Sequence, residues 1–456
     1  MGLLKKNMMI ELLQGFLGYP PTEQQIAGFL SIVKTGNSEH LCLGDVAIPL
    51  KSPAVKYMEN MTTALGHYIR DRNEESYSAA LKSLQKIKFP VSKIWIDKDI
   101  LYVKFEREKL MKCILKEVSR NGYNYGKSKL MSFMKITIEK GASGESSAPA
   151  TSHRGHKLAF HVGEILKHAG AAVELQECDE SKPRGEKRQN PPAPISNEQK
   201  KDGKEEEENE ISLCFAREPL PTTMISKANQ YLFAPVVHMK TNKVWDGSAE
   251  DLCKILVEEL KRAAMQKHGD IDTPEWSQFL EEQAWRCMSL QMLSVSHCSP
   301  LKVEVDGVTQ NSRESAFILY NYARLCTIFQ SFEESVSEGE IPPLPDIEEV
   351  DFALLRNDEE WQLVWGYIFH FPDIIEENAV EILKGSGKFR TVAVTKFLSS
   401  FSHRVSEYYS RYHVLCEPLP HLLPTIYARL HLLQAIKTVM EICFATLGVE
   451  SPTSFM

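Results

Sequence analysis

A long polar segment, residues 177–210, sets the strongest limit on what this chain can fold into. It consists mainly of Lys, Arg, Glu, Asn and Pro and ends in the run Lys-Glu-Glu-Glu-Glu-Asn-Glu. Because it holds almost no apolar side chains, it cannot bury enough surface to offset the entropy lost on ordering, and we predict disorder. The 456-residue chain must then fold as ordered parts on either side of this segment.

The composition narrows the class of protein. A hydrophobic content of 43% is ordinary for a globular chain with a buried core. The sequence contains no apolar run long enough for a transmembrane helix and no signal-peptide core, so we expect no membrane partner. Ten cysteines are scattered without a Cys-x-x-Cys pair, which argues against a zinc site and for reduced thiols in the cytoplasm. We expect no metal and no cofactor.

The net charge of −8 is unevenly distributed. Residues 1–140 hold 22 Lys and Arg against 14 Asp and Glu, whereas the last third is acidic. Between Lys104 and Lys140, ten basic residues stand against four acidic ones, with aromatic residues interleaved. Such a run suits phosphate contacts and base stacking, and Lys127 and Lys129 are candidate RNA contacts. The alternative is a solvated, lysine-rich helix face.

Hydrophobic spacing predicts a mixed α/β structure in the first two thirds. We predict helices over 9–29, 52–87 and 106–121, a hairpin over 92–105 and a buried strand over 230–239. Two capped helices should follow, over 248–266 and 273–292, and then an edge strand over 301–307. The rest reads as helical, beginning with Asn311 as an N-cap answered by Glu314.

Four groups of residues follow one another in the last third: Tyr320, Ala323 and Arg324; Leu354, Leu355, Glu360, Leu363, Phe371 and Pro372; Phe401, Tyr408, Tyr409, Val414 and Leu415; and Leu447, Gly448, Val449, Pro452 and Met456. In this order they resemble the DALR anticodon-binding domain of arginyl-tRNA synthetases, a helical bundle. The N-terminal part resembles the additional domain of the same enzymes, which ends in a Tyr-Gly turn and contacts the tRNA elbow. We therefore predict mixed α/β N-terminal and middle parts and a C-terminal all-α DALR anticodon-binding helical bundle. In this sequence the N-terminal turn is Tyr125-Gly126.

The resemblance divides the chain into four regions. These are an additional domain (1–140), a low-complexity linker (141–210), a remnant of a class I catalytic domain (211–310) and the DALR bundle (311–456).

A local cluster of positive charge lies inside the acidic bundle. Residues 384–413 hold six Lys and Arg and one acid, Glu407, beside three tyrosines. Cations on the backbone and aromatics under splayed bases are how single-stranded RNA loops are read. The resemblance implies that Tyr408, Tyr409 and Met456 touch the anticodon. Adjacent helical residues point about 100° apart, so one of the two tyrosines can be buried. Arg324 and Arg429 are expected to donate hydrogen bonds within the bundle. The RNA-binding candidates are Tyr408, Tyr409, Tyr412, Lys388, Arg390, Lys396, Arg404, Arg411 and Met456, with Lys127 and Lys129.

The nucleotide-binding motifs are degenerate. His153, Gly155 and His156 keep the letters of the family's His-x-Gly-His signature, which implies a strand-to-helix junction near ATP phosphates. A relic or a surface loop is the other interpretation. The polar segment falls where most of the family's nucleotide-binding sheet would lie, so we expect that sheet to be absent. Of the family's Lys-Met-Ser-Lys loop only Met239 and a displaced lysine remain, and His238 stands in place of the first lysine. The sequence contains no other catalytic motif.

The sequence therefore indicates a non-catalytic tRNA-binding protein related to arginyl-tRNA synthetases. The resemblance implies arginine tRNA as a partner, no DNA, and a role in presenting that tRNA to a methyltransferase that makes 3-methylcytidine in the anticodon loop. Two alternatives stay open. One is an active synthetase; the other, favoured by the acidic last third, is a protein scaffold without RNA binding.

Overall fold

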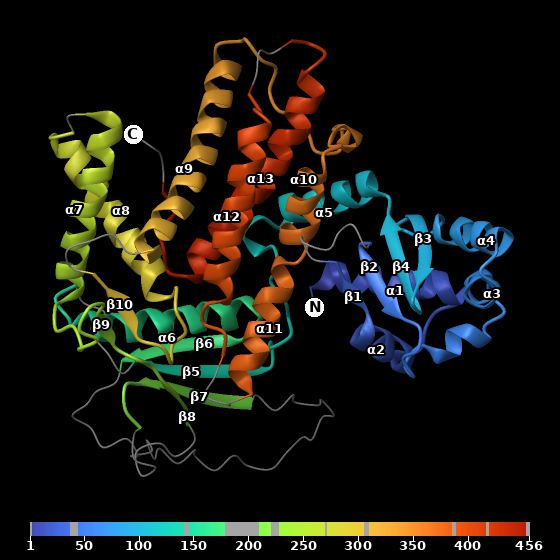
Figure 1. The fold of residues 1–456 in the computed structure, drawn as a ribbon, viewed down its shortest axis with the longest axis horizontal. Coiled ribbons are helices and arrows are strands. Elements are labelled where there is room, and N and C mark those ends of the chain that lie inside the picture. The colour runs from blue at the N-terminus through green and yellow to red at the C-terminus, as the bar shows by residue number, and fades with distance from the viewer. Residues whose placement is uncertain are drawn as a thin grey trace, which may run out of the picture.

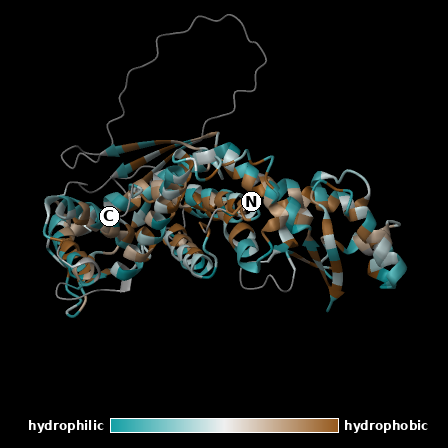
Figure 2. Ribbon diagram, turned by 90° about the horizontal axis from the view of Figure 1, so that it is seen from above, coloured by the Kyte–Doolittle hydropathy of each residue, from teal (hydrophilic) through white to brown (hydrophobic). Residues whose placement is uncertain are grey.

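The structure is a computed structural model that describes residues 2–36, 44–140, 146–177, 209–219, 228–269, 271–304, 310–384, 389–415 and 419–452. An N-terminal α/β unit projects from one side of the molecule, and a tall helical bundle stands on a second sheet (Figure 1). Seen from above, the same two parts give an elongated outline (Figure 2). The predicted disorder of 177–210 falls almost entirely outside the described residues.

The N-terminal unit is a four-stranded sheet, in the order β1-β2-β4-β3, covered by helices. The predicted hairpin is confirmed: β3 and β4 pair antiparallel, and Lys98 and Asp99 at the turn have φ of 45° and 63°, as the common two-residue hairpin turn requires. The predicted helix over 106–121 is also confirmed. The elements are α1 (Leu3–Leu17), α2 (Glu23–Ile32), β1 (Lys34–Thr35), β2 (Val46–Pro49), η2 (Lys56–Asn60), α3 (Ala64–Asp71), α4 (Glu74–Leu84), β3 (Val91–Asp97), β4 (Ile100–Phe105), α5 (Arg107–Asn121) and η3 (Gly122–Asn124).

Two long helices predicted here are wrong as single elements. The first breaks because Gly18 takes a left-handed φ of 74° and caps α1, a conformation that glycine adopts cheaply. The second divides into η2, α3 and α4, because Thr63 and Asn73 accept backbone N–H bonds and start new helices. Periodicity alone does not show such restarts.

The expectation that the central sheet is absent is wrong. Four parallel strands pair in the order β6-β5-β7-β8, with Ile136 of β5 opposite Val173 of β6 and Ile211 of β7. The polar segment connects two of these strands, so its composition carries no information about the sheet on either side. The strands are β5 (Met134–Lys140), β6 (Ala172–Glu177), β7 (Asn209–Ala216) and β8 (Ala228–Leu232), and α6 (Ala150–His168) packs on β5 and β6. The central strand β5 lies within the range that the sequence assigned to the N-terminal domain, so the four-domain division stays a prediction.

The middle part continues with a parallel strand pair and two helices. The predicted strand over 230–239 is two strands, β8 and β9 (Val236–His238), and the second pairs with β10 (Leu301–Val303). Ser248 caps α7 (Ala249–His268) by accepting from the Asp251 N–H, and Thr273 caps α8 (Pro274–Met292). Both helix starts were correctly predicted, because short hydroxyl side chains satisfy the first free N–H groups.

The last third is an all-helical bundle, as predicted. It contains α9 (Gln310–Ser337), η4 (Phe352–Leu354), α10 (Asp358–Trp361), a π-helical turn η5 (Gln362–Ile368), α11 (Phe371–Leu383), α12 (Ala393–Arg411) and α13 (Leu423–Thr446). The predicted N-cap at Asn311 is wrong, because α9 already includes Gln310. Glu314 instead accepts hydrogen bonds from Ser399 and joins α9 to α12.

The N-terminal unit is attached to the bundle through a buried carboxylate. Asp45, just before β2, accepts a hydrogen bond from the Phe105 N–H (2.8 Å) and another from the Trp361 indole (3.2 Å). Beside it, the Trp365 indole donates to the Gly36 carbonyl at 2.9 Å. Burial raises the pKa of Asp45 to about 6, because the charged form loses its hydration.

The raised pKa of Asp45 predicts a pH-dependent stability. A carboxyl whose folded pKa exceeds its unfolded value stabilises the fold at acid pH, and that contribution is lost as pH rises through about 6. Asp45→Asn removes this titration and keeps a neutral side chain of the same shape. The free energy of unfolding of wild type minus that of Asp45→Asn should fall by about 1–3 kcal/mol between pH 4.5 and 7.5, measured by denaturant titration. A difference that does not change with pH would contradict this assignment.

Candidate nucleic-acid interface

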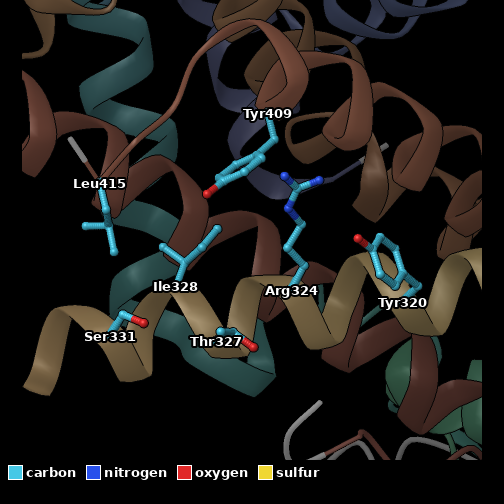
Figure 3. A pocket seen from close by; sticks show the side chains of 7 residues that line it. All are labelled: Tyr320, Arg324, Thr327, Ile328, Ser331, Tyr409 and Leu415. Atoms are coloured by element: carbon cyan, nitrogen blue, oxygen red, sulfur yellow. The ribbon is translucent and has the colours of Figure 1, made fainter. Parts of the chain in front are cut away.

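A cavity of about 390 Å³ opens between α9 and α12 on the bundle. We call it the Arg324 pocket. Figure 3 shows the Arg324 side chain rising from α9 towards Tyr409, which reaches across from α12. The pocket is lined by Tyr320, Arg324, Thr327, Ile328, Ser331, Tyr409 and Leu415.

The centre of this pocket is a cation stacked on an aromatic ring. The Arg324 guanidinium carbon lies 3.8 Å from the centroid of the Tyr409 ring, which is close cation–π contact. Among the described residues, Arg324 has no ion-pair partner. The prediction that Arg324 serves as a hydrogen-bond donor within the bundle is therefore wrong in its chemistry: its contact is with a ring, and it lines a cavity.

The helical repeat explains which residues join Arg324. Tyr320, Arg324, Thr327, Ile328 and Ser331 recur at intervals of three or four along α9, so they form one stripe facing α12. The sequence analysis singled out Tyr320 only as a motif letter and did not name Thr327 or Ser331. Counting three and seven positions from Arg324 along the helix would have found them.

Of the two neighbouring tyrosines, Tyr408 is buried and Tyr409 lines the pocket. Tyr408 is fully buried, and its hydroxyl donates to the Glu360 carboxylate at 3.0 Å. Burial raises the pKa of Tyr408, and the neighbouring Glu360 charge adds to the shift. Tyr408 therefore holds the bundle together and cannot stack on a ligand, which corrects its place among the candidate RNA contacts.

Three further candidates are already engaged by carboxylates. Arg404 pairs with Glu407 at 2.6 Å, and Arg411 pairs with both Glu359 and Glu407. Tyr412 donates to Glu359 at 3.4 Å. These side chains are committed to intramolecular contacts, so the local excess of positive charge overstates the cations available to a ligand. Arg429, as predicted, bonds within the bundle, to Glu360 at 3.3 Å.

The remaining basic candidates among the residues that the structure describes line a second hollow. Two neighbouring cavities of about 980 and 600 Å³ share Glu377 and Arg390, and together we call them the α11 trough. Arg390 is paired with Glu381 at 2.9 Å. The other cations that line the trough are Lys6, Lys127, Lys129, Lys384 and Lys396.

The trough and the Arg324 pocket face different ways. Lys396 and Tyr409 lie on the same helix, α12, but they are thirteen positions apart, so they point about 140° away from one another around the helix axis. The predicted cluster over 384–413 is therefore not one surface. Candidates Lys388 and Met456 lie outside the described residues.

The His-x-Gly-His residues lie in the first two turns of α6, the helix that follows β5, so they stand at the expected strand-to-helix junction and not in a surface loop. His153 is buried, and its ring centroid lies 6.1 Å from that of Trp285. A Cβ added to Gly155 would meet the Phe233 ring at 2.4 Å, so the aromatic ring presses directly on the helix. The surface-loop interpretation is wrong, because the helix starts at Ala150 and turns these residues towards the core.

Arg154, which the sequence analysis did not consider, connects the middle part of the molecule. Its buried guanidinium donates to the carbonyls of Ala234 (2.6 Å), Ser296 (3.0 Å) and Met292 (3.3 Å). Buried charges need such partners. Nothing in the sequence marks an arginine between two histidines as a buried hydrogen-bond donor to backbone carbonyls.

Comparisons with known proteins agree with the predicted bundle. Residues 318–455 match the DALR anticodon binding domain. The chain is similar to the protein named DALR anticodon-binding domain-containing protein 3 from Danio rerio, with 34% identity over 200 residues, covering 42% of this chain and 36% of that protein. The Rattus norvegicus protein of the same name is 32% identical over 194 residues, covering 41% and 36%. The alignments thus span about a third of the length of these curated relatives.

A solved structure shows the same overall fold. Thermus thermophilus arginyl-tRNA synthetase superposes with a TM-score of 0.59 at 10% identity, covering 99% of this chain and 100% of that one. The likeness at this identity concerns the fold alone. Across the described residues, no helix combines the length and apolar character that a membrane span needs.

The different positions of the two tyrosines give a stability prediction. Tyr408→Ala removes a buried ring and leaves Glu360 without one donor, so it should lower the free energy of unfolding by about 3–5 kcal/mol. Tyr409→Ala should lower it by about 1 kcal/mol or less, because it loses mainly a partly exposed cation–π contact. Denaturant unfolding of both variants, which differ by one position, measures this. Equal losses would contradict the assignment.

Proposed function

We propose that this protein binds tRNA without aminoacylating it, and that the Arg324 pocket holds an unpaired base of the anticodon loop. The observation that carries the proposal is the Arg324–Tyr409 stack in an open cavity of a DALR anticodon binding domain. The names of the relatives and the synthetase-like fold support it.

The chemistry of the pocket suits an unstacked nucleotide. A guanidinium offers both a flat face for stacking and several N–H donors for base edges or phosphate. Thr327 and Ser331 add hydroxyl groups that donate or accept, while Ile328 and Leu415 supply apolar walls. A site with one charge and mixed walls would recognise a base in a loop, since a paired base would present neither its face nor its Watson–Crick edge.

We also propose that the protein is not a synthetase. The nucleotide motif is folded into α6, and Phe233 packs against Gly155 where the motif would have to open towards ATP. The parallel sheet is compatible with an active synthetase, but the packing of Phe233 against Gly155 argues against that alternative. The proposed partners remain arginine tRNA and, in the cytoplasm, a methyltransferase that forms 3-methylcytidine in the anticodon loop.

A protein scaffold without RNA binding is the second candidate function. The ion pairs of Arg404 and Arg411 favour it, because they reduce the positive charge that a polyanion would meet on α12. The two functions differ in salt dependence. Engaged phosphates make RNA affinity fall steeply as salt rises, whereas a scaffold has no RNA affinity to lose.

The proposed base site predicts a loss of RNA binding on removing one charge. Arg324→Gln should weaken binding of an arginine-tRNA anticodon stem–loop by about tenfold or more, because it removes the cation and its stack on Tyr409. Fluorescence anisotropy with a labelled stem–loop measures the dissociation constant. Arg356→Gln is the matched control, since Arg356 is an exposed arginine of the same bundle outside the pocket. Equal effects of the two variants would indicate nonspecific electrostatics and refute the base site.

The proposed partner role predicts a change in tRNA modification. Cells lacking the protein should lose most 3-methylcytidine from the arginine tRNAs that the protein binds, and wild-type protein should restore it. Arg324→Gln should restore it poorly if expressed at the wild-type level. Mass spectrometry of purified arginine tRNA measures the modification. Normal 3-methylcytidine in the deleted cells would rule out the methylation role and leave tRNA binding to be judged separately.

A further inference from the structure

A third hollow, separate from the α11 trough, adjoins the Arg324 pocket along α9. It is an apolar groove of about 270 Å³ between α7, α8 and α9, which we call the Trp276 groove. Leu260 and Ala264 of α7 and Trp276 and Phe279 of α8 form its outer walls. The α9 wall is made by Ala316, Leu319, Tyr320 and Ala323.

The groove and the pocket adjoin at one residue, Tyr320. Tyr320 lines both, and the α9 stripe of the groove runs on, three and four residues further, into Arg324, Thr327 and Ile328 of the pocket. Tyr320 and Arg324 are one helical turn apart, about 6 Å along the axis. That step is longer than the rise of about 3.4 Å between stacked nucleotides, so two bases bound at these positions would be unstacked from one another.

The walls of the groove suit a flat aromatic ligand. The Trp276 and Phe279 rings stand edge to face, with centroids 5.7 Å apart at 88°. Gln283 and Cys287 are polar, while most other lining groups are hydrocarbon. Stacking on such rings tolerates every base, because each base has a π-face.

We propose that the Trp276 groove takes a second unpaired nucleobase, the immediate neighbour of the base held in the Arg324 pocket. This inference rests on the proposed function, because it places two consecutive bases of one RNA loop along α9. The groove is smaller than the cavities that enclose drug-sized ligands, so it fits one ring system better than a row of protein side chains. Its position next to the positively charged Arg324 pocket favours an RNA base as the bound ring.

The first test uses the indole of Trp276 as a reporter. A base stacking on Trp276 should quench its fluorescence, so binding of the anticodon stem–loop should quench wild type more than Trp276→Phe, which keeps an aromatic ring. Trp276→Leu should weaken binding about fivefold or more while retaining an apolar wall. Trp95→Leu is the matched control, because Trp95 lies on β3 of the N-terminal unit, stacked on Tyr102.

The second test varies the RNA and leaves the protein intact. Stem–loops carrying one abasic loop nucleotide at a time should show two adjacent positions whose loss weakens binding to wild type. In Trp276→Leu, one of the two abasic penalties should vanish, and in Arg324→Gln the other should. This pattern would support the proposal even if Trp276→Leu is less stable, because each variant is compared with itself.

The outcomes separate this inference from the proposed function. If Arg324→Gln weakens binding and neither Trp276 variants nor a second abasic position has any effect, the base site stands and the groove is not part of it. If the stem–loop does not bind wild type, both proposals fail. Unchanged RNA binding by Trp276→Leu with loss of a protein partner would overturn the nucleobase subsite and assign the groove to protein contact.

Discussion

The buried carboxylate of Glu360 is the interaction on which the candidate site depends. Its two oxygens accept from the Tyr408 hydroxyl (3.0 Å), the Arg429 guanidinium (3.3 Å) and the Asn357 N–H (2.9 Å). A buried charge is tolerable only when its hydrogen bonds are complete, and removing one partner is costly. The bond from Tyr408 holds that side of α12 against Glu360, and Tyr409, the next residue of the helix, lines the Arg324 pocket.

Charge pairing explains why this surface differs from a simple basic patch. Carboxylates of α10 and α12 engage Arg411, and Glu407 engages Arg404. The pocket that remains has one central cation, Arg324, stacked on a ring. Recognition by stacking and hydrogen bonding depends on which base is presented, whereas a row of unpaired lysines would bind any polyanion. If the pocket holds a base as proposed, this arrangement favours selective binding of a loop.

The middle of the molecule is an α/β unit whose parts are joined by buried contacts. Its four parallel strands lie in the order β6-β5-β7-β8, and α6 packs on them. Arg154 fastens α6 to the segments around Ala234 and Ser296, and Phe233 packs on Gly155. The sheet also supports the bundle, because the Tyr231 hydroxyl of β8 donates a hydrogen bond to the Ile382 carbonyl of α11.

The amino-acid sequence by itself determined the local elements with clear chemical signals. Capping side chains located the starts of α7 and α8, alternation located the hairpin, and ordered motifs predicted the helical bundle. The prediction that the central sheet is absent was wrong, because the sequence of a strand does not show which other strand it pairs with. The basic residues of 384–413 were also grouped into one surface, whereas consecutive residues of a helix point about 100° apart.

Only the tertiary structure decided which side chains are available. Tyr408 and Tyr409 are adjacent letters, yet Glu360 from a distant segment draws one inward and leaves the other in the pocket. Arg390, Arg404 and Arg411 look alike in the sequence, and their partners come from acids up to 52 positions away. Exposure and pairing are properties of packed elements, and that is the physical reason why the sequence predicted the kind of site and the fold revealed its residues.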